Sequence, residues 1–206
     1  GAANVEGINE AAIIKRFPAA DTLEMLAGDL VYLEFYEEDL PWRYTIGQPD
    51  LEDNRLSPWL MLLVFKEEGI QENFRSLPMP TIRISDNALK EDIEQQAREA
   101  WAFAHVQLNW NEEEQIEDEG AYIKANPDYC VSRVLCPRRL RPSTNYVAFL
   151  VPTHAATRAE IPYYHRWTFS TAADADFESM ARRLSPLTAE EIALPQIDAI
   201  EAGSRE

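Results

Sequence analysis

The uninterrupted apolar run WLMLLVF, at positions 59–65, constrains the fold of this chain more than any other part of the sequence. A strand with one solvated face alternates apolar and polar side chains, whereas this run is apolar on both faces. Both faces must therefore be covered, and we expect a central strand buried between two layers. The run is too short to cross a bilayer, which takes roughly 20 apolar residues in a helix.

Other segments also have the pattern of strands. Residues 30–36 place Val31, Leu33 and Phe35 on one face and a mixed set on the other, so we expect a half-buried strand that pairs with the run at 59–65. Three more segments have strand patterns: 81–85 with Ile82 and Ile84 on one face, the apolar stretch 145–151, and 161–170 with one aromatic face.

Apolar residues spaced three and four apart predict one main amphipathic helix, from Asn87 to about Ala104. The stretch from Trp101 to Trp110 alternates like a strand, so we expect the helix to run directly into a strand. Short helices are expected at 176–184 and 187–200. With only 7 glycines and no glycine-rich turn after a strand, dinucleotide-binding and P-loop folds are disfavoured. We predict an α+β fold with a mixed sheet of about five or six strands.

The pattern also suggests a domain organisation. Residues 1–28 carry only a fragmentary apolar stripe and are expected to form an N-terminal arm on which no core rests. Residues 29–184 are expected to form a single α+β domain, followed by a C-terminal helix and linker-like tail at 185–206. Because the sequence begins with glycine and ends in a linker-like stretch, we expect it to be cut from a longer chain.

The charge of the chain limits its partners. The formal net charge is -17, from 36 acidic against 19 basic residues, and this disfavours nucleic acids and anionic membrane surfaces. We therefore expect protein partners, either other subunits or the remaining domains of the same chain, and the sequence leaves the oligomeric state open. Without a secretory signal, a cytoplasmic location is expected.

The two cysteines, Cys130 and Cys136, follow an Asn-Pro pair that is typical of a helix start, and Pro137 is a plausible helix stop. On a shared short helix they would be separated by roughly 9 Å of rise, which is too far for a disulfide. We expect free thiols in a reducing cytoplasm, with a disulfide as the alternative.

No catalytic or metal motif is evident. None of the 3 histidines has a metal-site spacing, and no serine lies in a nucleophile elbow, so we expect no metal, no cofactor and no enzymatic activity. His105 and His165 lie among aromatic residues, and we expect both to be hydrogen-bonded core imidazoles. Residues 111–120 carry six carboxylates and are expected to form a mobile loop. A calcium site is the alternative there, although the EF-hand spacing is missing.

The candidate partner-binding residues fall into two groups. Trp42, Arg43 and Tyr44 end the stretch EDLPWRY, which opens a connection of about 18 residues between two expected strands. Trp, Arg and Tyr are enriched at interaction hot spots, but the same residues can anchor a core edge, with Arg43 paired to Glu37, Glu38 or Asp39.

The second group is a cluster of arginines in an otherwise acidic chain: Arg133, Arg138, Arg139 and Arg141. Two interpretations stay open. The arginines can form an internal dock for an acidic loop, or a contact patch for an acidic partner or a second copy.

Five blocks of residues 30–184 resemble an uncharacterised family of large bacterial proteins: LVYLEFYEEDLPWRYT, LSPWLMLLVFKEEG, AWAFAHVQ, SRVLCPRRLRPSTNYVAFLVPT and YYHRWTFSTAADADFESMARRL. Some members of this family are associated with gene neighbourhoods of phage-tail-like contractile assemblies. The resemblance implies a non-enzymatic structural or interaction domain of a larger bacterial protein. The alternative is a small-molecule or carbohydrate-binding domain, or an unrecognised hydrolase, that uses Trp42 and Tyr44 as a stacking platform.

Overall fold

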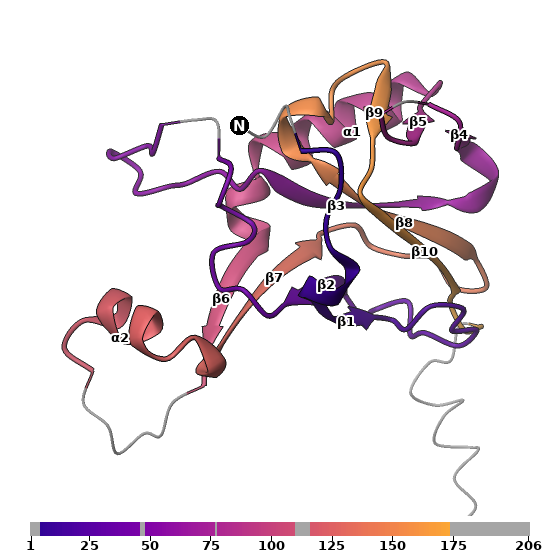
Figure 1. The fold of residues 1–206 in the computed structure, drawn as a ribbon. Coiled ribbons are helices and arrows are strands. Elements are labelled where there is room, and N and C mark those ends of the chain that lie inside the picture. Colours follow the sequence, from indigo (N-terminus) through magenta and orange to yellow (C-terminus); the bar gives the residue numbers. More distant parts are fainter. Residues whose placement is uncertain (1–4, 46–47, 77, 110–115, 174–206) are drawn as a thin grey trace, which may run out of the picture. The chain divides into compact units, whose positions relative to one another are not determined.

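The computed structural model describes residues 5–45, 48–76, 78–109 and 116–173 (Figure 1). These residues form ten strands in three antiparallel sheets together with two α-helices, so the protein is of the α+β class and mostly sheet. The elements are β1 (Ile13–Phe17), β2 (Val31–Phe35), β3 (Leu60–Lys66), β4 (Gln71–Asn73), β5 (Thr81–Arg83), α1 (Asn87–Arg98), β6 (Ala104–Leu108), α2 (Glu119–Ala125), β7 (Cys130–Cys136), β8 (Asn145–Pro152), β9 (Glu160–Pro162) and β10 (His165–Ser170). The expected fold class is confirmed, but the single mixed sheet is wrong.

The three sheets have the strand orders β1-β2-β7-β6, β10-β8-β3 and β4-β5-β9. The second sheet lies between two apolar cores. The first sheet covers one of its faces, and α1 covers the other together with β5 and β9 (Figure 1). Among the described residues, no helix is long and apolar enough to cross a membrane.

Strand β3 is apolar on both faces because each face packs in a different core. Leu60, Leu62 and Val64 belong to the first core, whereas Met61 and Leu63 belong to the second. The predicted burial of both faces is therefore confirmed. The prediction that this strand is central in its sheet is wrong, because β8 is the middle strand and β3 lies at the edge.

The pairing expected between β2 and β3 is also wrong. Strand β2 pairs with β1 and β7, while β3 pairs with β8 in a different sheet. The physical reason is that an apolar pattern determines which face of a strand is buried but not which strand supplies its hydrogen bonds. The long connection between the two strands carries the chain from one layer to the other.

Helix α1 begins after Asp86, whose carboxylate accepts hydrogen bonds from the backbone N–H groups of Ala88 (2.8 Å) and Leu89 (3.3 Å). It ends at Arg98, and a 3-10 turn (Ala100–Phe103) leads into β6. The expected change from helix to strand is confirmed, with an earlier helix end than predicted.

Two segments differ from their expected structure. The N-terminal segment supplies β1 to the first sheet and the buried Met25 to the first core, so core packing does rest on it. The cysteines lie on strand β7 rather than on a helix, because residues 130–136 alternate between buried and half-buried side chains. Only a 3-10 turn, Pro127–Tyr129, follows the Asn-Pro pair.

Two more expected elements differ in their bounds. Part of the acidic segment is helical, since Asp118 caps α2, while residues 111–115 lie outside the described residues. The strand expected at 161–170 is divided into β9 and β10, which join different sheets. Proline has no N–H to continue a ladder, and Pro162 ends β9.

The described residues all belong to one compact unit. The helices expected at 176–184 and 187–200 lie outside the described residues. The predicted domain boundaries therefore stay a prediction.

Candidate functional site

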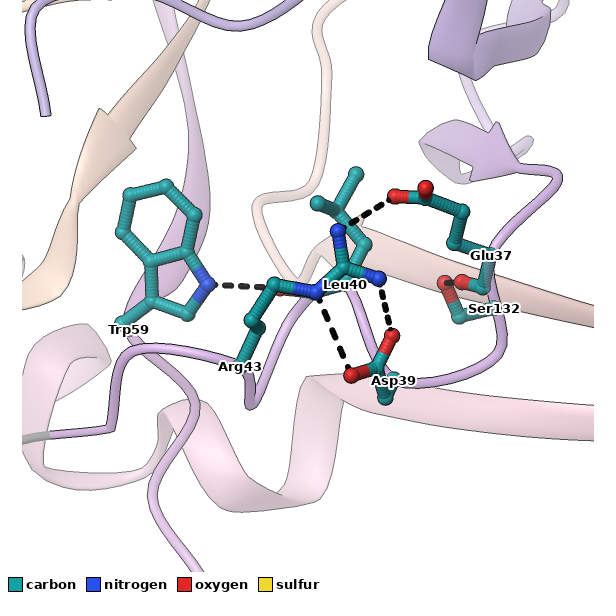
Figure 2. Close-up of polar contacts among 6 residues, drawn as sticks. All are labelled: Glu37, Asp39, Leu40, Arg43, Trp59 and Ser132. Carbon is teal, nitrogen blue, oxygen red and sulfur yellow. Dashed lines mark hydrogen bonds and ion pairs between the residues drawn. The ribbon is translucent and has the colours of Figure 1, made fainter. Parts of the chain in front are cut away.

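The EDLPWRY turn is held by its own arginine (Figure 2). The guanidinium of Arg43 donates to both carboxylate oxygens of Asp39, with Nε 3.2 Å from Oδ2, and its Nη1 lies 2.7 Å from Oε2 of Glu37. These hydrogen bonds raise the pKa of Arg43 further above its ordinary value, with Asp39 as the largest cause. The predicted pairing with Glu37 and Asp39 is confirmed, and the charge of Arg43 is largely compensated within the chain.

The aromatic residues of this turn pack against the protein. Trp42 is half-buried against the first core. Tyr44 makes an edge-to-face contact with Trp59, with ring centroids 5.1 Å apart. Sequence reasoning missed Ser132 of β7, a fully buried side chain whose hydroxyl donates to the carbonyl of Glu37 at 2.6 Å (Figure 2). Of the two interpretations of EDLPWRY, the geometry supports a structural anchor.

The connection that starts at this turn contains a short hydrogen-bonded loop, residues 50–55, which we call the tip. The backbones of Asp50 and Arg55 exchange hydrogen bonds of 2.8 and 2.9 Å, and Oδ1 of Asp50 accepts from the N–H groups of Glu52 and Asp53. Leu51 between them is 85% exposed. Arg55 lies over the ring of Trp101, 4.2 Å from its centroid. The tip was missed from sequence, although Asp, Asp and Asn in D-L-E-D-N are residues typical of turns.

The four arginines of the cluster fall into two groups, of which the first, Arg133 and Arg138, has partners inside the protein. Arg133 donates to Glu34 on β2 (Nε to Oε1, 3.0 Å) and to Gln107 on β6 (3.0 Å), and Arg138 pairs with Asp92 on α1. For these two residues the internal interpretation holds, with partners on β2 and α1 rather than in the acidic loop.

Arg139 and Arg141 are exposed. Among the described residues, no carboxylate lies within ion-pair distance of either. The structure therefore separates two arginines with internal partners from two that have no ion-pair partner within the described ranges.

Arg139 and Arg141 both border a groove of about 750 Å³, which we call the α1 groove. One wall is a face of α1, the other is the segment after β7, and the end of β3 contributes to the floor. The lining residues are Phe65, Lys66, Gly69, Ile70, Asp86, Ala88, Leu89, Asp92, Gln95, Gln96, Glu99, Pro137, Arg138, Arg139, Arg141 and Tyr146. The groove follows the helix from its N-cap to its C-cap, a rise of roughly 20 Å.

The acids and bases of the α1 groove differ in how they are satisfied. Asp86 caps the helix, and Asp92 accepts from Arg138 and from the buried Gln96 (3.0 Å). Glu99 accepts from Gln95 at 3.2 Å. In contrast, Lys66 joins Arg139 and Arg141 as a lining cation without an ion-pair partner among the described residues. Each groove carboxylate on or next to the helix thus accepts at least one hydrogen bond, although Oε1 of Gln96 is buried without a partner, and three lining cations have no ion-pair partner among the described residues.

The histidines have different environments. His165 is buried, and its Nε2 lies 3.3 Å from Nη1 of Arg16 while Nδ1 lies 3.5 Å from Glu10. Burial lowers the pKa of His165, Arg16 lowers it further and Glu10 opposes both. His105 is exposed on the edge strand β6, where its Nε2 lies 2.9 Å from the carbonyl of Ala102. The expected core imidazole is confirmed for His165 and wrong for His105.

No group of three or more His, Cys, Asp or Glu side chains that could hold a metal ion occurs within the part of the chain that the structure describes. The cysteines are free and buried, as predicted. Burial raises the pKa of the Cys136 thiol to about 11, and this outweighs the opposing effect of Arg138. A thiol with this pKa is protonated at neutral pH and is a poor nucleophile.

Comparisons with known protein families, with curated proteins and with solved structures find no match.

Proposed function

We propose that this chain is a non-enzymatic interaction domain that binds an acidic segment of a partner protein in the α1 groove. The observation that carries the proposal is that three cations without an ion-pair partner in the described part of the chain, Lys66, Arg139 and Arg141, line one groove whose own carboxylates already accept hydrogen bonds. An incoming carboxylate can form charge-assisted hydrogen bonds with these arginines without displacing an existing partner.

The shape of the groove favours an extended peptide over a compact ligand. A groove of roughly 20 Å accommodates about six residues of extended chain at 3.3 Å each. The half-buried side chains of Ile70 and Leu89 in its lining give apolar contacts for one or two side chains of the peptide. A segment that combines carboxylates with an aliphatic residue therefore matches both parts of the lining.

The overall charge of -17 opposes an acidic partner at long range. At physiological ionic strength the Debye length is about 8 Å, so distant carboxylates on this chain are largely screened from a ligand in the groove. The lining itself carries four cations, Lys66, Arg138, Arg139 and Arg141, against three carboxylates, Asp86, Asp92 and Glu99, so its net charge is slightly positive in a strongly acidic chain.

Fluorescence anisotropy with a short labelled peptide of alternating Glu and Leu tests the proposal. The double variant Arg139→Gln/Arg141→Gln is expected to bind about tenfold more weakly or worse. The matched control Arg75→Gln/Arg158→Gln removes the same charge at exposed positions outside the groove and should bind within about twofold of wild type. An equal loss in both variants, or a Gln/Leu peptide that binds as well as the Glu/Leu peptide, would refute the proposal.

The alternative, a small-molecule or carbohydrate-binding domain or an unrecognised hydrolase, has one observation in its favour. A hollow of about 400 Å³ lies beside the EDLPWRY turn and is bordered by Tyr44 and Trp59. A carbohydrate platform uses several free aromatic faces, whereas Trp42 packs against the core and only Tyr44, which is 39% exposed and contacts Trp59, is accessible in this turn. The α1 groove therefore supports the interaction domain better.

The proposed cellular role rests on the resemblance of residues 30–184 to a family of large bacterial proteins. We infer a structural role in a larger bacterial protein, in a phage-tail-like assembly and in the cytoplasm. Free buried thiols support a reducing compartment. Purification of the full-length protein with its genomic neighbours tests the assembly role, and a protein without any partner at micromolar concentration would contradict it.

A further inference from the structure

The tip at residues 50–55 presents an apolar side chain within an acidic setting. Leu51 is 85% exposed, and Asp50, Glu52 and Asp53 surround it in the sequence. The backbone exchange between Asp50 and Arg55 and the capping of two N–H groups by Asp50 hold this arrangement in place. A preformed turn loses little conformational freedom when it binds, so the tip is suited to insertion into a partner surface.

The α1 groove has the complementary chemistry. It offers Lys66, Arg139 and Arg141, which have no ion-pair partner among the residues that the structure describes, beside the half-buried apolar residues Ile70 and Leu89. The tip thus carries one aliphatic side chain among three carboxylates, of which that of Asp53 pairs with Arg55 at 3.2 Å, and the groove carries half-buried apolar side chains beside cations and the carboxylates of Asp86, Asp92 and Glu99. The two surfaces therefore match in the sign of their unpaired charges and in each offering an apolar contact.

Within one chain the two surfaces do not meet. None of residues 48–57 lines the α1 groove. The connection is tethered by Arg55 over the ring of Trp101, just beyond the groove-lining Glu99, and by the hydroxyl of Thr45, which donates to the carbonyl of Ser57 at 3.1 Å. The exposed side chain of Leu51 therefore remains available to a second molecule.

We propose that the tip of one copy of this chain docks in the α1 groove of a second copy. The proposal rests on the function proposed above for the groove and assigns it a particular acidic segment. Because the two surfaces differ, the contact is heterologous and leaves a free groove on one copy and a free tip on the other. The free tip and free groove can pair reciprocally within the same two copies, as a symmetric dimer, or take up further copies at both ends.

The contact is small. A six-residue tip buries less surface than the roughly 1,600 Å² of a standard stable interface, so we expect weak, concentration-dependent association. Charge pairing across the contact also makes the association weaker at high salt.

Sedimentation of the 206-residue chain and two complementary variants tests the proposal. The tip variant is Leu51→Ser/Glu52→Lys and the groove variant is Arg139→Glu/Arg141→Glu. All four positions are exposed, so folding should be preserved. The average mass of wild type should rise with concentration between about 10 and 500 μM, whereas each variant alone stays monomeric.

A mixture of the two variants is the decisive sample. The groove variant retains an intact tip and the tip variant retains an intact groove, so the mixture should form a dimer of one copy of each and nothing larger. The matched control Leu23→Ser/Glu24→Lys changes another exposed Leu-Glu pair, with Leu23 73% exposed, and should associate like wild type.

The possible failures are distinguishable. If the Glu/Leu peptide binds the groove but wild type stays monomeric, or the mixture does not dimerise, the second-copy proposal is overturned and the groove function stands. If the peptide does not bind and the groove variant still associates through its tip, both the groove function and this proposal are overturned. An equal loss of association in the control variant would also overturn the second-copy proposal.

Discussion

The indole Nε1 of Trp59 donates a hydrogen bond to the carbonyl oxygen of Leu40, across 19 positions of the chain. The backbone N–H of Trp59 also donates to the carbonyl of Pro41 at 2.8 Å. Together these bonds join the two ends of the long connection at the start of β3. The connection is therefore fixed at its base while its tip remains exposed.

We expect Trp59→Phe to lower the free energy of unfolding by about 1–3 kcal/mol, because it leaves the carbonyl of Leu40 without its donor in a buried setting. Trp42→Phe is the comparison, since Trp42 is only half-buried and should cost less. Urea denaturation of both variants measures the difference. Equal losses would show that packing volume, rather than the hydrogen bond, accounts for the role of Trp59.

Arg138 and Arg139 are adjacent in sequence but should differ in their effect on stability. Arg138→Gln breaks the ion pair with Asp92, which is partly exposed, so we expect a loss of up to about 1 kcal/mol. Arg139→Gln and Arg141→Gln remove charges without internal partners and should change stability by no more than about 0.5 kcal/mol. Chemical denaturation distinguishes these outcomes, and a larger loss for Arg139→Gln would contradict the division of the cluster.

The cysteines should be unreactive in the folded protein. Burial raises the pKa of Cys130 above its ordinary value and that of Cys136 to about 11, and both side chains are buried. An aromatic disulfide reagent at about pH 8 should therefore modify neither thiol in the native protein and both thiols after denaturation. Rapid modification of a thiol in native protein would contradict the buried positions on β7.

Stability should fall as the pH is lowered through the titration of two histidines. Burial lowers the pKa of His165 and of His154, so the unfolded chain binds more protons than the folded one from about pH 6.5 downward to the folded pKa values. The stability that these two neutral imidazoles contribute is fully present above about pH 6.5 and is lost as the pH falls through the folded pKa values.

Urea titrations of wild type, His165→Gln and His154→Gln between about pH 5.5 and 7.5 measure this effect. Each variant should show a shallower dependence on pH than wild type, and the double variant the shallowest. Parallel curves for all four proteins would show that these imidazoles do not account for the pH dependence.

Local patterns predicted much of the secondary structure. The runs that became β2, β3, β5 and β8, and the helix that became α1, were visible in the spacing of apolar residues, because burial of a face imposes a period on the sequence. The cysteine strand β7 was missed because an Asn-Pro pair resembles a helix start, although residues 130–136 alternate. Local start and stop signals are weaker than the burial of a whole strand face.

In the candidate sites, contacts between neighbours in the sequence were predictable, whereas contacts between distant segments were not. The pairing of Arg43 with its acidic neighbours was predictable, because these residues lie within six positions of one another. The partners of Arg133 and Arg138 were not, since Glu34 lies 99 and Asp92 lies 46 positions away. The exposure of Leu51 was also invisible, because an isolated leucine in a loop has no periodicity from which burial can be inferred.

The sequence by itself determined that β3 is covered on both faces, that α1 has one apolar face and that the chain is strongly acidic. These properties depend on side-chain chemistry and on the period of the backbone. Only the tertiary structure decided that β2 and β3 belong to different sheets and that Lys66, Arg139 and Arg141 border one groove. Hydrogen-bond partners and convergent charges depend on contacts between distant segments, which a local pattern does not encode.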